Sequence, residues 1–467
     1  MVQREERLRG LAREAGQGHL FEDWGALEER ARQAYLDQLE ALDFAQLPAL
    51  RALLRQSGES AAPPRLEAPE VFGLERDAAQ AEQAEAARRR GREELAAGRV
   101  GFVLVAGGQA SRLGYDGPKG AFAIGPVSGR SLFEIHARRL RAVAERFGVA
   151  APWYVMTSPA NDAATREFFE RHAWFGLPRE DVFFFSQAMM PAVDAEGRVL
   201  LAGPGRLFLA PNGHGGSLAA LRTSGALDDA RRRGLTQLSY FQVDNPLALP
   251  ADELFLGLHA QAGAGMSSKV VEKRSAGEKV GVIGRIDGRM GCIEYSDLPE
   301  SLREARDARG KLVFGAGNIA LHALALEFVA DLTEGELKLP WHLARKAMRV
   351  WSEGAEREVQ GVKFETFVFD ALARSSASVT LEVERAREFS PVKNREGEDS
   401  PESSRADLTR LHAGWVRAAG LPEPPLDEAG RPRVEVCPLL AQHEQEFLAS
   451  GVRAPRVVAG GHLYEAP

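Results

Sequence analysis

Cysteine is scarce in this sequence of 467 residues, which limits the kinds of site the chain can hold. Only Cys292 and Cys437 occur, and neither belongs to a C-x-x-C pair. Two cysteines permit at most one disulfide bond, which argues against a disulfide-stapled fold. Structural zinc usually needs clustered Cys and His ligands, so a zinc site is disfavoured as well. We therefore predict two reduced thiols.

Long apolar runs are also missing. No stretch approaches the roughly 18 apolar residues that a membrane-spanning helix requires. The first residues, MVQREERLRGLAREAG, lack the apolar core of a signal peptide. These absences predict a soluble, cytoplasmic protein with no membrane partner. We expect it to be a monomer or a weak homo-oligomer.

An excess of positive charge is the third absence. The formal net charge is −7, whereas a protein that binds nucleic acid needs a broad basic face. The arginine-rich run at residues 88–92 is flanked by glutamates, which is typical of a solvated helix face. We therefore expect no nucleic-acid partner. A small anionic ligand would have to be bound by cations that are gathered locally.

The length and composition are those of a globular protein with two or three domains, since 44% of the residues are hydrophobic and 27% are charged. Residues 1–98 are predicted to form a helical N-terminal unit followed by a linker and a further helix. Residues 99–420 are predicted to form the main α/β domain. Residues 421–467, which are Pro-rich at first, are predicted to form a small C-terminal β-rich unit.

Apolar strand-like runs alternate with amphipathic helical segments through the central domain. The predicted strands are 102–106, 153–157, 182–186, 238–243 and 268–272, and the predicted helices include 131–147, 161–171, 217–233, 320–330 and 406–419. This alternation predicts a doubly wound, mostly parallel, Rossmann-like α/β sheet with helices on both faces. In such sheets, ligands bind at the carboxyl ends of the strands.

One strand leads directly into a glycine-rich loop, in the stretch LVAGGQASRLGYDGPKG at residues 104–120. The loop fits neither a P-loop nor a G-x-G-x-x-G dinucleotide fingerprint. Its adjacent glycines, Gly107 and Gly108, would allow backbone N–H groups to approach a phosphate or a base. Arg112 and Lys119 would supply positive charge for phosphate oxygens. The alternative is an ordinary strand–helix turn with exposed charges.

The same loop, followed by Ser131-Leu132-Phe133, resembles the nucleotide-binding signature of the eukaryotic-type UDP-N-acetylhexosamine pyrophosphorylases, which are UTP-dependent sugar-1-phosphate uridylyltransferases. The resemblance continues in order along most of the chain. The segments that carry it include GHLFEDW, SQAMMPAVD, APNGHGG, VDN, KVVEK, IEYSDLP, GAGNIALH, GVKFETFVFD, EFSPVKN and VEVCPLL. It implies that the central domain is a nucleotidyltransferase domain. The implied reaction joins UTP and a sugar 1-phosphate to give a UDP-sugar and pyrophosphate.

The resemblance also implies a role for individual residues. It assigns catalysis to Arg112, Lys119 and Lys393, nucleotide binding to Gly107, Gly108, Gln187, Gly213, His214 and Asp244, and sugar binding to Gly281, Glu294, Asn318, Phe367 and Phe369. Asp244 would also be the ligand of Mg²⁺, which is the expected cofactor. Without the resemblance, purely structural roles stay open. Lys393 could be a loop lysine, Gln187 the end of a strand, Asp244 a helix cap, and the two phenylalanines core residues.

Substrate choice is open to two interpretations within this family. The motif string as a whole favours N-acetylglucosamine 1-phosphate. His214 replaces the asparagine that is usual in the acetylhexosamine enzymes, which favours UDP-glucose or broad UDP-sugar synthesis instead. A non-catalytic UDP-sugar-binding protein is a remoter hypothesis, because a fold and its pocket can outlast their chemistry. A nicotinamide oxidoreductase is disfavoured by the adjacent-glycine loop.

Overall fold

The computed structural model describes residues 1–56 and 64–466, whose contacts form two compact units. Unit 1 combines Met1–Pro64, Gln187–Ser217 and Lys338–Val368, and unit 2 combines Arg65–Ser186, Leu218–Leu337 and Phe369–Pro467. The contacts therefore group the chain differently from the three consecutive segments expected from the sequence. The physical reason is that the N-terminal helices pack against strands that occur much later in the chain, and composition carries no signal of such long-range packing.

Unit 1 places three helices against a small sheet. The helices are α1 (Val2–Glu14), α2 (Glu29–Glu40) and α3 (Leu47–Gln56), and the strands run in the order β15 (Ala355–Glu365), β14 (His342–Ser352), β6 (Leu201–Gly203) and β7 (Arg206–Leu207). A separate two-stranded ladder joins β5 (Met189–Pro191) to β8 (Leu209–Pro211). Tyr35, Leu36 and Phe364 lie in the shared core. Trp351 of β14 donates a hydrogen bond to Asp23 at 2.7 Å, which ties the long hairpin to the helical segment.

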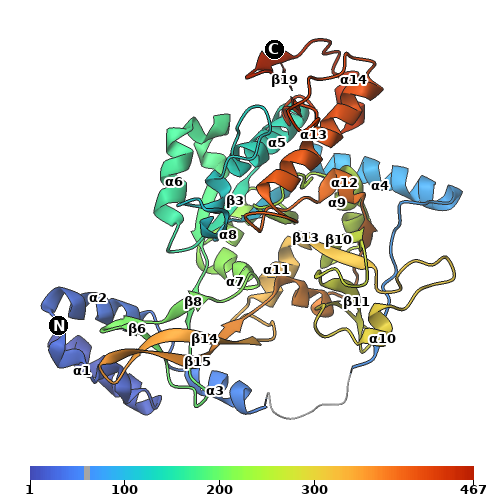
Figure 1. Ribbon diagram of the computed structural model, residues 1–467. Coiled ribbons are helices and arrows are strands. Elements are labelled where there is room, and N and C mark those ends of the chain that lie inside the picture. The colour runs from blue at the N-terminus through green and yellow to red at the C-terminus, as the bar shows by residue number, and fades with distance from the viewer. Residues whose placement is uncertain (57–63, 467) are drawn as a thin grey trace. The chain divides into compact units, whose positions relative to one another are not determined.

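Unit 2 is built on a ten-stranded sheet (Figure 1). Its parallel part has the order β9 (Gln237–Gln242), β2 (Val100–Val105), β3 (Trp153–Thr157) and β4 (Val182–Ser186), so four predicted strands are confirmed. The remaining strands are β13 (Ala316–Ala325), β10 (Met266–Glu272), β16 (Thr380–Glu382), β11 (Val282–Ile286), β12 (Arg289–Ile293) and β1 (Leu66–Glu67). Most of these pair antiparallel, and β10 with β16 is parallel. The α/β class is confirmed.

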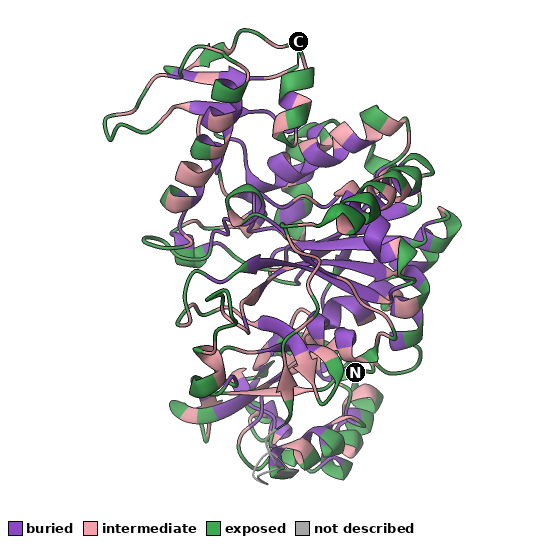
Figure 2. Cartoon of the chain, turned by 90° about the vertical axis from the view of Figure 1, so that its right-hand side faces the viewer, coloured by how far each residue is buried: buried purple, intermediate pink, exposed green. Residues whose placement is uncertain are grey.

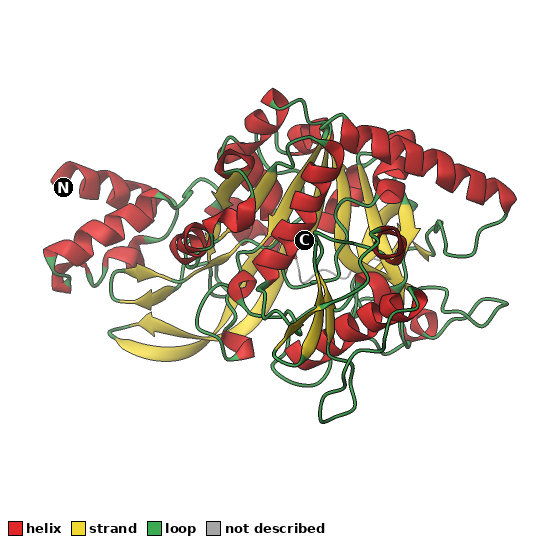
Figure 3. Ribbon diagram, turned by 90° about the horizontal axis from the view of Figure 1, so that it is seen from above, coloured by secondary structure: helices red, strands yellow, loops and turns green. Residues whose placement is uncertain are grey.

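Helices cover this sheet, and its central strands are buried along most of their length (Figures 2 and 3). The helices are α4 (Ala78–Ala96), α5 (Leu132–Phe147), α6 (Asp162–Arg171), α8 (Ala226–Arg232), α9 (Glu253–Gln261), α10 (Glu300–Arg303), α11 (Leu326–Leu332), α12 (Arg385–Glu388), α13 (Pro401–Ala418) and α14 (Glu444–Ala449), while α7 (Gly216–Thr223) spans the boundary between the units. Helix α5 starts at a Ser131 cap whose side chain accepts the N–H of Glu134. Its buried face, which includes Phe133 and Leu140, joins the main core.

Two predicted helices differ from the structure. The helix expected over 217–233 is split into α7 and α8, because Gly225 adopts a φ of +81° between them. The helix expected over 320–330 is instead the end of β13 followed by α11. An apolar run that is buried on all sides has no periodicity that separates a strand from a helix, which explains the second error.

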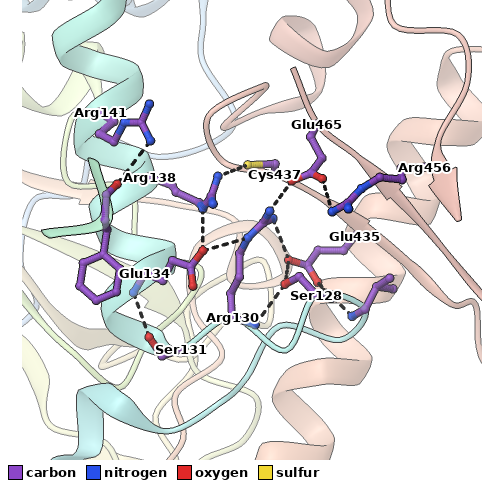
Figure 4. Close-up of polar contacts among 12 residues, drawn as sticks. Ser128, Arg130, Ser131, Glu134, Arg138, Arg141, Glu435, Cys437, Arg456 and Glu465 are labelled. Carbon is purple, nitrogen blue, oxygen red and sulfur yellow. Dashed lines mark hydrogen bonds and ion pairs between the residues drawn. The ribbon is translucent and has the colours of Figure 1, made fainter. Parts of the chain in front are cut away.

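The C-terminal segment forms a three-stranded sheet in the order β17 (Val434–Val436), β19 (Gly461–Tyr464) and β18 (Arg456–Val458), as its short apolar runs predicted for the first and third. Arg130, next to the start of α5, anchors it (Figure 4). The buried Arg130 guanidinium pairs with Glu465, with Glu435 at 3.6 Å and with Glu134 at 3.2 Å. The Ser128 hydroxyl donates to the same Glu435 at 2.7 Å. The C-terminal segment is thus held to the loop that precedes α5.

Both cysteines are buried and free, as expected. Among residues 1–56 and 64–466, no helix combines the length and the apolar character that crossing a bilayer would need.

Several histidines are buried in unit 2, and because of them the protein should lose folding stability at acid pH. Burial, with help from Arg139, lowers the pKa of His136 and of His412 to about 3. Between pH 6.5 and 3 the unfolded chain binds protons that the folded chain cannot, so stability falls as the pH drops. At pH 5 the loss is about 2 kcal/mol for each histidine. We expect His412→Gln to reduce the difference between the urea unfolding free energies at pH 7 and pH 5 by about that amount. An unchanged difference would contradict this.

Candidate active site

The glycine-rich loop leaves the end of β2 and is fixed by side chains that follow β3. Ser158 donates its hydroxyl to the carbonyl of Gly107 at 2.8 Å. Asn161 donates its side-chain amide to the carbonyls of Ala106 at 2.9 Å and Gly108 at 3.2 Å. Within the described residues, the N–H groups of Gly107 and Gly108 have no hydrogen-bond partner. Two backbone donors on a rigid loop are suited to an anion.

The loop then turns back on itself before Lys119. The N–H of Lys119 donates to the carbonyl of Gly108 at 3.1 Å, and Gly117 adopts a φ of +149° in the turn. Gly120 packs directly on the ring of Phe133, since a Cβ at this position would lie 2.2 Å from a ring carbon. The GPKG sequence therefore fixes the backbone on both sides of Lys119.

Lys119 and Asp244 form an ion pair, with 3.2 Å between Nζ and Oδ2. Asp244 follows β9, and the two side chains are only 18% and 12% exposed. Partial burial strengthens such a contact compared with one at the surface. The parallel pairing of β2 with β9 brings these residues together, although they lie far apart in the sequence.

The segment that carries Lys393 is attached at the same place. The N–H of Val392 donates to the carbonyl of Asp244 at 2.8 Å. Lys393 is half-exposed, and its Nζ lies 3.5 Å from a carboxylate oxygen of Asp399. A Cβ on Gly114 would lie 3.9 Å from the guanidinium carbon of Arg395, so the glycine-rich loop and this segment are neighbours. Arg395 is a cation at the site that the sequence did not single out.

Arg112 lies in the 3-10 helix Ser111–Leu113 of the same loop. Its side chain is exposed, and it forms no ion pair with any described residue. Of the four charged residues predicted for phosphate chemistry, Lys119 and Asp244 touch, Lys393 follows a residue bound to Asp244, and Arg112 extends from the adjoining loop.

A second group contains three predicted sugar-binding residues. The carbonyl of Gly281 accepts the N–H of Asn318 at 2.8 Å, and a Cβ on Gly281 would lie 3.5 Å from Oε1 of Glu294. The Asn318 amide also contacts the sulfur of Cys292 at 3.7 Å. Burial, with the neighbouring carboxylate of Glu294, raises the pKa of Cys292, so its thiol stays protonated. Phe369 is buried.

This group lies at the same end of the sheet as Asp244. Strand β13 runs antiparallel to β9, with His322 opposite Tyr240. Residues that precede His322 in β13 therefore lie toward the end of β9 that leads to Asp244. Asn318 is one of these residues, so the carboxyl edge of the parallel strands carries both groups.

Unit 1 carries the other predicted residues. Gly213 adopts a φ of +81°, and a Cβ there would lie 2.3 Å from the carbonyl oxygen of Thr366. The preceding residue, Asn212, donates its N–H to Ala188 at 3.4 Å, which extends the β5–β8 ladder to the neighbour of Gln187. Only glycine fits at position 213, and its backbone is held close to that of the buried Gln187 segment.

His214 and Phe367 stack on one another in the same unit, with 5.3 Å between their ring centroids and 28° between their planes. The Nδ1 atom of His214 accepts the N–H of Val368 at 3.2 Å. Burial, with the nearby His342, lowers the pKa of His214 to about 4. The ring is therefore neutral at pH 7, and its Nε2 carries the proton.

Asp244 is the carboxylate that the sequence predicts as the ligand of Mg²⁺. Among the described residues, no group of three or more His, Cys, Asp or Glu side chains could hold a metal ion. Mg²⁺ in nucleotide enzymes is commonly held by one or two carboxylates together with substrate phosphates. A single, partly buried carboxylate beside a phosphate-type loop fits that requirement.

A family model described as UTP–glucose-1-phosphate uridylyltransferase matches residues 62–400. The chain belongs to this uridylyltransferase family. The match spans the glycine-rich loop, Asp244, the predicted sugar-binding residues and Lys393, so every predicted site residue falls inside it.

Similar proteins extend the likeness over most of the chain. UDP-N-acetylhexosamine pyrophosphorylase-like protein 1 of Xenopus tropicalis is 38% identical over 448 residues, which cover 91% of this chain and 87% of that protein. UDP-N-acetylglucosamine pyrophosphorylase of Saccharomyces cerevisiae is 34% identical, over 87% of this chain and 90% of that protein. The crystal structure of the Trypanosoma brucei uridine diphosphate N-acetylglucosamine pyrophosphorylase in complex with inhibitor superposes with a TM-score of 0.82 at 26% identity, covering 96% of this chain and 95% of that one.

The two glycines of the loop are expected to respond differently to alanine. Gly120→Ala would drive a methyl group into Phe133 and should lower the free energy of unfolding by about 1–3 kcal/mol. Gly108→Ala meets no atom within 4 Å, so it serves as the matched control and should change stability by less than about 0.5 kcal/mol. Urea unfolding of both variants measures this. Equal losses would show that the contact with Phe133 does not constrain the loop.

Proposed function

We propose that this protein is a UTP:sugar-1-phosphate uridylyltransferase that forms a UDP-sugar and pyrophosphate. The observation that carries the proposal is the Lys119–Asp244 pair, which lies beside the glycine-rich loop and the Lys393 segment in a chain of this family. The site gathers positive charge and backbone donors at the carboxyl edge of a parallel sheet.

The reaction needs positioning and charge neutralisation more than covalent catalysis. A phosphate oxygen of the sugar 1-phosphate attacks the α-phosphorus of UTP, the bond to the β-phosphate bridging oxygen breaks, and pyrophosphate leaves. The attacking group is already an anion, so no general base is required. The N–H groups of Gly107 and Gly108, with Arg112 and Lys119, would hold the triphosphate and stabilise the charge that develops on the leaving group. Lys393 would hold the sugar phosphate.

Asp244 would hold Mg²⁺ together with phosphate oxygens of the nucleotide. When bound, this cation neutralises phosphate charge and orients the triphosphate. Lys119 now contacts the same carboxylate, so a bound nucleotide would draw the ammonium group toward the phosphates.

Base and sugar recognition would use the remaining residues. Gln187 can donate and accept through one amide, as uracil requires. His214 would contribute a neutral ring that Phe367 supports by stacking. Glu294 and Asn318 would hydrogen-bond sugar hydroxyls, and Phe369 would supply an apolar wall. The histidine that replaces the family's usual asparagine makes His214 a candidate determinant of which sugar is accepted.

N-acetylglucosamine 1-phosphate is the substrate that we favour, because relatives that share most of the chain are named UDP-N-acetylglucosamine diphosphorylase or pyrophosphorylase. The alternative, glucose 1-phosphate or a broad range, is favoured by His214. Pyrophosphate release with UTP and the 1-phosphates of N-acetylglucosamine, N-acetylgalactosamine, glucose and galactose separates the two. We expect kcat/KM to be highest for N-acetylglucosamine 1-phosphate. An equal or higher value for glucose 1-phosphate would reverse the preference.

Lys119→Ala tests the catalytic part of the proposal. We expect kcat to fall by about 100-fold or more, because the lost charge acts mainly on the leaving pyrophosphate. The affinity for UDP-sugar, measured by calorimetry, should fall much less. Lys346→Ala removes the same charge from an exposed position on β14 and should leave both values unchanged. Normal pyrophosphate release by Lys119→Ala would refute the role, and UDP-sugar binding without turnover by the wild type would favour a non-catalytic binding protein.

A further inference from the structure

The side chain next to Asp244 makes contacts that the mechanism above does not use. Asn245 is 4% exposed and lies against the segment that leads to Lys393. Its amide nitrogen donates to the carbonyl of Glu388 at 2.7 Å, and its amide oxygen accepts the N–H of Ser390 at 3.0 Å. One buried side chain therefore satisfies a backbone acceptor and a backbone donor of the same segment.

The end of that segment returns to the backbone beside Asn245. The N–H of Val392 donates to the carbonyl of Asp244 at 2.8 Å, one residue before Lys393. Three hydrogen bonds thus join residues 388–392 to the pair Asp244-Asn245. A shift of this segment would move Lys393 relative to Asp244 and Lys119.

The start of the segment is anchored from the interior. Lys269 of β10 is fully buried, and its Nζ lies 2.5 Å from Oε2 of Glu388 and 2.7 Å from a carboxylate oxygen of Asp252. Burial alone would lower the pKa of Lys269, but the two carboxylates raise it above its ordinary value. The ammonium group of Lys269 therefore keeps its charge, and it holds the carboxylate of Glu388 from the interior of the domain.

Helix α13 holds the segment from its other side, through contacts with Ser390. The Ser390 hydroxyl donates to Asp407 at 2.7 Å, and its carbonyl accepts the hydroxyl of Ser404 at 2.9 Å. Both partners belong to α13. The segment is thus held on one side by α13. On the other side it is held by Asn245, which follows Asp244 just after the end of β9.

We propose that Asn245 is a positioning residue, whose side-chain amide fixes residues 388–393 so that Lys393 stands ready for the sugar phosphate beside Asp244, with Lys269 anchoring the same segment through Glu388. The inference rests on the proposed function for the identity of the ligand. It assigns Asn245 no contact with substrate. Its predicted effect is on one substrate only, because the UTP-binding loop is fixed by Asn161, not by Asn245.

The two asparagines therefore make a matched pair for the experiment. Asn245→Ala should raise KM for sugar 1-phosphate by about 10- to 100-fold, while KM for UTP changes little. Asn161→Ala, which frees the glycine-rich loop, should instead raise KM for UTP. Ser239→Ala is the structural control, since Ser239 is buried on β9 and donates to the carbonyl of Pro250 at 2.6 Å without touching the segment.

The outcomes separate a positioning role from a merely structural one. Thermal unfolding ranks the stability of all three variants. If Ser239→Ala is destabilised as much as Asn245→Ala and shows the same loss toward sugar 1-phosphate, or if Asn245→Ala affects both substrates equally, the proposal is overturned. Hydrogen exchange of residues 389–395 gives a readout that needs no activity. It should rise in Asn245→Ala and not in Ser239→Ala, and an unchanged rate would also overturn the proposal.

The wild-type assay keeps this result separate from the proposed function. Wild-type enzyme that releases no pyrophosphate with any sugar 1-phosphate refutes the function, whatever the variants do. An active wild type with variants that behave alike refutes the positioning role alone.

Discussion

The parallel pairing of β2 with β9 is the constraint on which the site depends. Val105 lies opposite Gln242 at the end of this ladder, so both strands end at the same edge of the sheet. The glycine-rich loop leaves one strand and Asp244 follows the other, and the contact between Lys119 and Asp244 results. A shift in the register of the ladder would separate the loop from the carboxylate without changing any residue at the site.

The rest of the site is attached to this edge by backbone hydrogen bonds. Asn161 holds the carbonyls of the glycine-rich loop, and Asn245 and the carbonyl of Asp244 hold the segment before Lys393. Both asparagines are buried, and each satisfies backbone groups of a connecting segment at the site. Buried loops need such partners, because unsatisfied backbone groups are costly. The backbone segments that carry Lys119 and Lys393 are therefore held in part by neutral amides.

The sequence predicted the parallel strands well because each is a short apolar run bounded by turn residues. The glycine-rich loop could also be predicted, since adjacent glycines and a GPKG turn are local sequence signals. The sequence did not predict the β14–β15 hairpin. Exposed residues of β14 include Arg345, Lys346 and Arg349, and its polar and apolar residues do not alternate regularly. Nor did the sequence indicate Asn161 or Arg395, because their importance comes from contacts with segments far away in the chain. The grouping of the N-terminal helices with residues 338–368 has the same origin.

Charge explains how an anionic chain could prepare a site for anionic substrates. Two of the predicted cations are already paired, Lys119 with Asp244 and Lys393 with Asp399. Under the proposed function, an entering phosphate would exchange one anionic partner of each lysine for another, so neither ammonium group would lose its counter-charge. Under the proposed function, Asp244 would then hold the divalent cation that accompanies the nucleotide. The carboxylates hold the two lysines in position, and under the proposed function substrate binding would redirect charges that are already in place.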